Sequence, residues 1–119
     1  MLFSTMAPIF AAKTSSMSTP YGTLYGSIGG GVSDFYGGKF CSGTTNIGQN
    51  VNRIVFSVVS KKTSNGETVG SGDRFSNQNA KSVGGTYEVG GYATTKLTFY
   101  GTHDAIHTNG YAVYTSTAY

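Results

Sequence analysis

Residues 51–60 read VNRIVFSVVS, and this stretch decides the fold class of the chain. β-branched and aromatic residues favour strands because their side chains pack well on a pleated surface. Six of the ten residues are apolar and leave little room for water on either face: Val51, Ile54, Val55, Phe56, Val58 and Val59. A strand that is apolar on both faces is expected to be covered on both sides. We therefore predict that residues 51–60 form a central strand of a sheet.

Segments of the same kind occur along the rest of the chain, each bounded by Gly, Asn or Ser, which is typical of strands separated by turns. The further predicted strands are Tyr21–Ile28, Val32–Phe40, Glu67–Gly70, Ser82–Val89, Tyr92–Tyr100 and Tyr111–Tyr119. Two Asn-Gly pairs, Asn65-Gly66 and Asn109-Gly110, suit type I′ hairpin turns. No window carries the stripe of an amphipathic helix. The sequence therefore predicts an all-β fold, a single antiparallel barrel or sandwich of seven to eight short strands with an extended N-terminal arm.

Two glycine doublets lie in KSVGGTYEVGGYATTKLTFYG, residues 81–101. Glycine weakens the interior of a strand, so paired glycines mark turns, bulges or the close approach of another backbone. Gly84-Gly85 and Gly90-Gly91 enclose four strand-forming residues, 86–89. We predict a short strand held between two sharp bends.

Length and charge limit the domain organisation and the partners. The 119 residues suffice for one domain, which we divide into an N-terminal arm and linker, residues 1–20, and an all-β domain, residues 21–119. Only 11% of the residues are charged, and the eight Lys and Arg are scattered singly apart from Lys61-Lys62. A phosphate-binding surface needs basic residues concentrated on one element, so we expect no nucleic-acid partner.

The first twenty residues, MLFSTMAPIFAAKTSSMSTP, contain an interrupted apolar run followed by a polar, turn-rich link over Ser15–Pro20. The apolar run is too short to cross a bilayer, which requires about 20 apolar residues, so we expect no transmembrane segment. Two interpretations remain open. The apolar residues cover the core of their own domain, or they dock on a neighbouring copy of the chain.

The segment VGGTYEVGGYATTKLTFYG resembles a characteristic stretch of the dirigent proteins and their allene-oxide-cyclase-like relatives. The residues that carry the resemblance are Val83, Gly84, Gly85 and Thr86, followed by Gly91, Tyr92, Ala93 and Thr94. Upstream, NRIVFSVVSKKTSNGETVGSGDRF is similar to the Phe-rich strand and Gly-x-Asp segment of that family, so the resemblance covers about residues 51–119. It implies an antiparallel barrel whose interior holds an apolar or phenolic ligand.

The resemblance also implies roles for single residues. Asp73 would be the acid of the cavity, because an apolar surrounding favours a protonated carboxyl, and Thr94 would donate a hydroxyl. Asp34 is the candidate for the second acid of the family. The aromatic residues expected to contact the ligand are Tyr87, Tyr92, Phe99 and Tyr100. From the residues alone, we prefer to interpret Asp73 as an exposed turn residue within Ser71–Arg74, so we expect little or no catalysis.

Other chemical motifs are weaker. HDAIH, residues 103–107, has two histidines at metal-ligand spacing, but the surrounding Gly, Thr and Asn favour a surface loop. Cys41 is the only cysteine of the sequence, so an internal disulfide is excluded. We expect Cys41 to be a buried apolar residue rather than a nucleophile. GSIGGG, residues 26–31, lacks the helix and Lys of a phosphate-binding loop. We therefore expect neither a metal nor a cofactor.

Three classes of function follow from these observations. The first is a small binding module for an apolar or phenolic molecule. The second is a self-assembling structural subunit, a homo-oligomer that buries the N-terminal arm and Tyr-rich faces against copies of itself. The third is a carbohydrate-binding module, because Tyr rings stack on sugar faces. The composition does not determine the compartment. Its many hydroxyl groups and few charges favour an extracellular or surface-exposed location.

Overall fold

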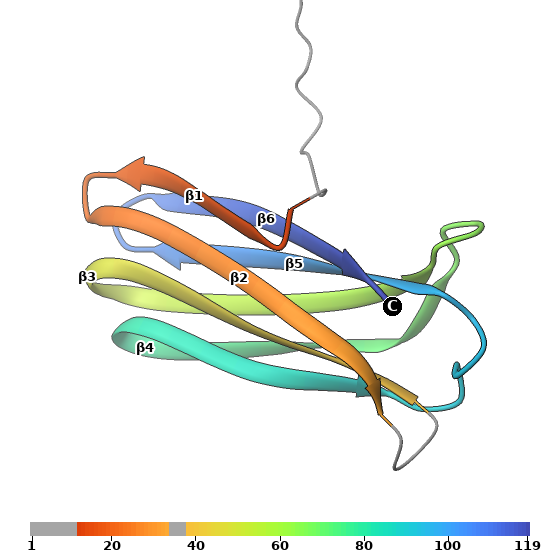
Figure 1. Cartoon of the computed structure of the whole chain (residues 1–119). Coiled ribbons are helices and arrows are strands. Elements are labelled where there is room, and N and C mark those ends of the chain that lie inside the picture. The colour runs from red at the N-terminus through yellow and green to blue at the C-terminus, as the bar shows by residue number, and fades with distance from the viewer. Residues whose placement is uncertain (1–11, 34–37) are drawn as a thin grey trace, which may run out of the picture.

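The computed structural model describes residues 12–33 and 38–119, in which all regular structure is strand (Figure 1). The six strands are β1 (Thr14–Thr19), β2 (Gly22–Ser33), β3 (Gly38–Lys62), β4 (Thr68–Val89), β5 (Leu97–Ile106) and β6 (Gly110–Ala118). The apolar run before Ala12, and Asp34, lie outside the described residues.

All six strands belong to one antiparallel sheet in the order β1-β2-β3-β5-β6, with β4 paired to β3. The sheet curls into a nearly closed, barrel-like shape (Figure 1). The predicted all-β antiparallel fold is therefore confirmed.

The curl comes from β3 and β4, which both reverse direction and fold the sheet over on itself (Figure 1). Residues 39–46 of β3 pair with β2 and with the end of β4. Residues 53–62 pair instead with β5, while β4 continues along the other side. The register shifts between Asn46 and Val51, where the strand turns over. Residues 51–60 thus have a paired strand on each edge, and their predicted central position is confirmed. The prediction that both faces exclude water is wrong for the outer face, where Val59 is 41% exposed.

The structure has six strands instead of the predicted seven to eight, because several segments predicted as connections between strands belong to strands themselves. Residues 41–50, CSGTTNIGQN, read as a loop, yet they continue β3. A glycine is required at the inward position 43 because a large ring fills the space next to it: a Cβ added to Gly43 would lie 2.3 Å from the Phe56 ring. The predicted strand Val32–Phe40 is wrong, because its described residues divide between β2 and β3.

Polar edge strands explain the other missed elements. Residues 71–79 of β4 are mostly exposed, since β4 pairs only with β3 among the described strands, so they carry no alternating pattern. The expected link Ser15–Pro20 lies largely in β1, a Ser- and Thr-rich strand paired with β2.

Residues 92–96, expected in a strand, form the connection before β5. Of the two glycine doublets, Gly90-Gly91 ends β4 with a positive φ of 86° at Gly91, whereas Gly84-Gly85 continues the strand.

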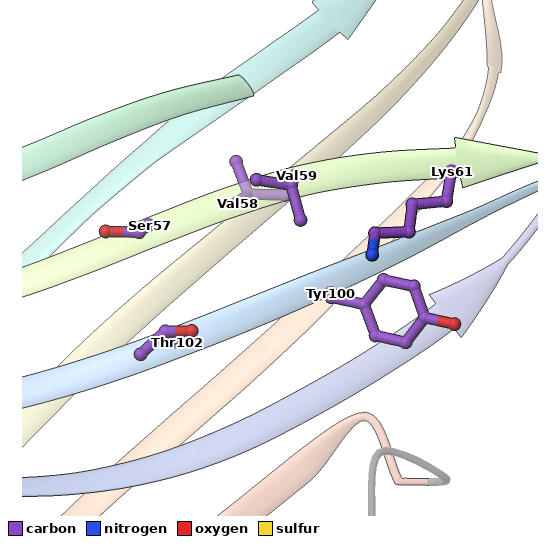
Figure 2. Close-up of a pocket in the computed structure, with 6 residues that line it drawn as sticks. All are labelled: Ser57, Val58, Val59, Lys61, Tyr100 and Thr102. Atoms are coloured by element: carbon purple, nitrogen blue, oxygen red, sulfur yellow. The ribbon is translucent and has the colours of Figure 1, made fainter. Parts of the chain in front are cut away.

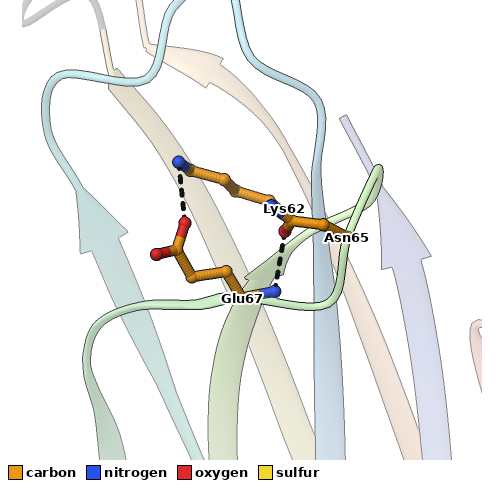
Figure 3. A network of polar contacts seen from close by, with 3 residues as sticks. All are labelled: Lys62, Asn65 and Glu67. Carbon is orange, nitrogen blue, oxygen red and sulfur yellow. Dashed lines mark hydrogen bonds and ion pairs between the residues drawn. The ribbon is translucent and has the colours of Figure 1, made fainter.

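Both predicted Asn-Gly hairpins form, but neither has the predicted type I′ geometry. That turn needs positive φ at both central residues, and among the described non-glycine residues only Asn79 has one. In the β3–β4 loop, Gly66 alone adopts positive φ, at 75°. Figure 3 shows what holds this loop: Asn65 Oδ1 accepts a hydrogen bond from Glu67 N at 2.9 Å, and Lys62 Nζ lies 2.8 Å from Glu67 Oε1.

The interior of the curled sheet is filled by buried side chains from β2 to β6, and Met17 of β1 packs partly buried against them. The buried apolar set comprises Leu24, Ile28, Cys41, Ile47, Val51, Ile54, Phe56, Val58, Val69, Val83, Tyr87, Val89, Leu97, Phe99, Ala105 and Val113. Tyr119, which follows β6, packs against this core and connects β2 with β5 through hydrogen bonds. Its main chain exchanges two 2.9 Å hydrogen bonds with Leu97, and its phenol oxygen accepts one from Gly30 N, also at 2.9 Å. The buried Lys39 ammonium donates to the main-chain oxygens of Tyr119 and Thr95.

Candidate functional site

A hollow of about 430 Å³ lies on the outer face of the sheet over β3 and β5 (Figure 2). We call it the outer hollow and define it by Ser57, Val58, Val59, Lys61, Tyr100 and Thr102. Its volume is within the range of small-molecule sites. The strand register places Val59 opposite Tyr100 and Ser57 opposite Thr102, so the two strands each contribute one side.

The hollow exists because side chains alternate across a strand. In β5 every second residue from Leu97 to Ala105 is buried, so Tyr100 and Thr102 face outward between them. In β3 the same alternation leaves Val59 with 41% of its surface exposed. The Lys61 ammonium lies 5.9 Å from the centroid of the Tyr100 ring, within range of a cation–π interaction. The arrangement offers an aromatic ring, an apolar floor, a cation and two hydroxyls to a ligand.

A second, more open hollow of about 480 Å³ adjoins the first across residues 57–59. We call it the Arg74 hollow; its other residues are Ser71, Gly72, Asp73 and Arg74 of β4. A positive φ of 70° at Gly72 bends β4 here, and Gly72 N donates a 3.1 Å hydrogen bond to the Tyr87 hydroxyl. The two hollows together cross three strands.

Asp104 and Arg74 give this face its electrostatic character. Asp104 of β5 is opposite Val55, an outward residue that is fully buried, and Arg74 is opposite the next outward residue, Ser57. Burial raises the pKa of the Asp104 carboxyl, and the positive charge of Arg74 partly opposes that rise. The carboxyl and the guanidinium are therefore coupled across the outer face.

The structure separates the residues that the sequence assigns to one interior site. Tyr87 and Phe99 are core residues whose ring centroids lie 6.3 Å apart, and Tyr92 packs partly buried against the same core. Thr94 is exposed in the β4–β5 connection. Tyr100 points outward into the outer hollow.

Asp73 lies on β4 rather than in a turn, and it is exposed. Its Oδ1 accepts a 2.8 Å hydrogen bond from the backbone N of Arg74. It is therefore not the buried acid that the dirigent resemblance implies. Of the residues assigned from the sequence, only Asp73 and Tyr100 line the hollows of the outer face.

Sequence reasoning missed most of the outer hollow. The signal was present in LTFYGTHDAI, residues 97–106, where Thr98, Tyr100, Thr102 and Asp104 alternate with Leu97, Phe99 and Ala105. This period of two puts the polar residues on one face. The partners from β3 could not be found in the same way, because the register between β3 and β5 is set only in the folded sheet.

The two histidines of HDAIH are not a pair of surface loop residues. His103 lies in β5 and is fully buried, where its ring stacks on Phe56 with centroids 5.2 Å apart. His107 follows β5, and its Nδ1 accepts a 3.1 Å hydrogen bond from Asn52 N. Among residues 12–33 and 38–119, no group of three possible metal-ligating side chains occurs.

The hydrogen bonds of His103 fix its tautomer. The Thr45 hydroxyl donates to Val55 O at 3.0 Å, so it must accept from His103 Nδ1, which lies 2.9 Å away. His103 Nε2 then accepts from the Thr115 hydroxyl at 2.7 Å. Burial lowers the pKa of His103 to about 4, a shift partly opposed by a backbone hydrogen bond with Thr44. The neutral ring therefore ties β3, β5 and β6 together inside the core.

Cys41 is fully buried, as the sequence predicts. Burial raises the pKa of its thiol to about 11, so the reactive thiolate is scarce near neutral pH. This cysteine is a packing residue.

Comparisons with known proteins leave the relationship of the chain to any family open. Neither protein-family models, nor curated proteins, nor solved structures give a significant match. The described part of the chain contains no helix that is long and apolar enough to cross a membrane.

Proposed function

We propose that the protein is a non-catalytic binding module that holds a small phenolic molecule in the outer hollow. The observation that carries the proposal is the combination of the half-buried Tyr100 ring, the exposed Val59 and the Lys61 ammonium around one concave site. A planar ring can stack on Tyr100 and cover Val59, and its hydroxyl can bond to Ser57 or Thr102.

The proposal keeps the ligand class that the dirigent resemblance implies and moves the ligand from the interior to the outer face. Buried rings such as Phe56 and Phe99 already occupy the interior. Among the described residues that line the outer hollow, none is a carboxylic acid or a histidine. Histidine and carboxyl groups are common general acids and bases, and we propose binding without turnover at this site.

Chemical-shift mapping with 4-hydroxybenzyl alcohol, a neutral phenol, tests this site. We expect saturable shifts at residues 57–61 and 98–102, and about tenfold weaker binding by Tyr100→Ala. Tyr25→Ala is the control, because Tyr25 is an exposed tyrosine, at 41%, that lies on β2 outside the outer hollow. Shifts that map to Tyr87 and Phe99, or equal losses in the two variants, would contradict the proposal.

Self-assembly is a second candidate, favoured by the free edge of β4. Among the described strands, β4 pairs only with β3, which leaves the other side of a 22-residue strand unpaired. Such an edge can accept a strand from another copy, and lysine at an edge blocks this. We expect light scattering to show an oligomer that Ser76→Lys and Gln78→Lys dissociate. A monomer before and after substitution would exclude assembly through this edge.

A further inference from the structure

Arg74 stands in the same row of side chains as two hydroxyls. Ser57 of β3 is opposite Arg74 on β4 and opposite Thr102 on β5. Residues directly opposite in antiparallel strands share a face of the sheet, with Cβ atoms about 5 Å apart. A guanidinium and two hydroxyls therefore follow one another across the outer face. Guanidinium and hydroxyl groups both donate hydrogen bonds, so this row is suited to an anion.

The neighbouring row supplies an apolar and aromatic surface. It consists of Val59 and, opposite it, Tyr100. Rows on one face of a strand are two residues apart, which is about 7 Å. A ring carrying a carboxyl group has roughly this length. A ligand whose ring lies on the Val59 row therefore places its carboxylate on the Ser57 row.

The Arg74 guanidinium is available for such a ligand. Within residues 12–33 and 38–119, the only ion pair closer than 4 Å joins Lys62 to Glu67. Asp73, the acid next to Arg74 in sequence, bonds to the backbone N of Arg74. Asp104 lies on β5, on the other side of β3 from Arg74. Burial raises the pKa of Asp104 and the positive charge of Arg74 lowers it, without an ion pair between the two side chains.

We propose that the natural ligand class of the outer hollow is an aromatic carboxylate. Its ring lies on Val59 and Tyr100, and its carboxylate binds Arg74 together with the hydroxyls of Ser57 and Thr102. This inference rests on the proposed function, to which it adds the charged group of the ligand and the residue that recognises it. Because the ligand shares Arg74 with Asp104, binding should also favour the protonated form of Asp104.

Two probes of matched shape test the inference on the full chain: 4-hydroxybenzoate, which is an anion near neutral pH, and 4-hydroxybenzyl alcohol, which is neutral. Calorimetric titration should show the benzoate binding about tenfold more tightly. Arg74→Gln should remove this preference while leaving the affinity for the alcohol unchanged. The matched control is Arg53→Gln, because Arg53 lies on β3 opposite Gln78 and Ile106, outside both hollows. It should keep the preference.

The outcomes separate the two proposals. Equal affinities for the benzoate and the alcohol in the parent chain overturn the carboxylate inference and leave the phenol-binding site standing. A preference that survives Arg74→Gln overturns the assignment of Arg74. If neither probe binds, both proposals are overturned; if only the alcohol binds, the carboxylate inference alone is overturned. Circular dichroism of the two Arg variants confirms that the sheet is intact before affinities are compared.

Discussion

The inner and outer faces of the β3–β5 pair differ in what their side chains do. On the inner face, Phe56, Phe99 and His103 are fully buried and touch side chains from other parts of the curled sheet. On the outer face, Val59 and Tyr100 of the same strands line an open hollow. The two sets alternate residue by residue. One pair of strands therefore carries core packing on one face and the proposed binding site on the other, and substitutions on the two faces should have separable effects.

The largest effect is expected from Phe56→Ala. Phe56 is fully buried between Phe75 and His103, with ring centroids 5.9 and 5.2 Å away. Removing a buried phenyl ring costs about 3–5 kcal/mol through lost burial and the cavity left behind. Urea unfolding measures this loss. Val59→Ala, on the outer face of the same strand, should cost far less, and similar losses for the two variants would contradict the division between the faces.

The next effect is a loss of stability in acid that depends on His103. Its pKa of about 4 in the folded protein lies below the ordinary value of 6.5, so the unfolded chain binds the proton more readily between these values. The stabilising contribution is present above pH 6.5 and is lost as the pH falls towards 4, by about 3 kcal/mol in total. Below pH 4, both states are protonated and the loss from this group ends.

Urea unfolding over this pH range measures the effect. His103→Gln removes the titration of His103 and leaves that of the carboxyl groups in place. The free energy of unfolding of this variant should therefore depend less steeply on pH than that of the parent chain. A ring-proton NMR titration gives the pKa of His103 directly in the parent chain. A midpoint near 6.5 would contradict the buried, neutral ring.

A third effect distinguishes two glycines on opposite faces of β2. A Cβ added to Gly26 would lie 2.3 Å from the His103 ring, whereas one added to Gly29 meets nothing within 4 Å. Gly26→Ala should displace the ring from Thr45 and Thr115 and cost about 1–3 kcal/mol, as overpacking of a core does. Gly29→Ala should be nearly neutral. Thermal unfolding of the two variants compares them, and equal melting temperatures would show that the ring has room to move.

The smallest effect on stability is expected from Tyr100→Ala. Because Tyr100 faces outward, its removal should change the free energy of unfolding by only about 0.5 kcal/mol. The same variant is expected to bind a phenol about tenfold more weakly. Urea unfolding checks the first expectation, and a loss comparable to that of Phe56→Ala would mean that the ring belongs to the core.

Much of the fold could be predicted because local physics decides it. The density of β-branched residues in VNRIVFSVVS identifies a central strand, which pairs with β4 on one edge and with β5 on the other, and the Asn-Gly pairs locate two hairpins. Two kinds of strand could not be predicted. Residues 71–79 are mostly polar because this part of an edge strand is exposed, and residues 41–50 contain Gly43 because the Phe56 ring fills the space next to it. Both patterns look like loops when the neighbours are unknown.

The sequence by itself determined that the chain is all-β, that residues 51–60 are central and that Cys41 is buried. These follow from propensity and hydrophobicity, which act over a few neighbouring residues. Only the tertiary structure decided that Val59 lies opposite Tyr100, that Phe99 meets Tyr87, and that Arg74, Ser57 and Thr102 form one row. The reason is strand register, because a shift of one residue exchanges the two faces and depends on contacts between distant segments.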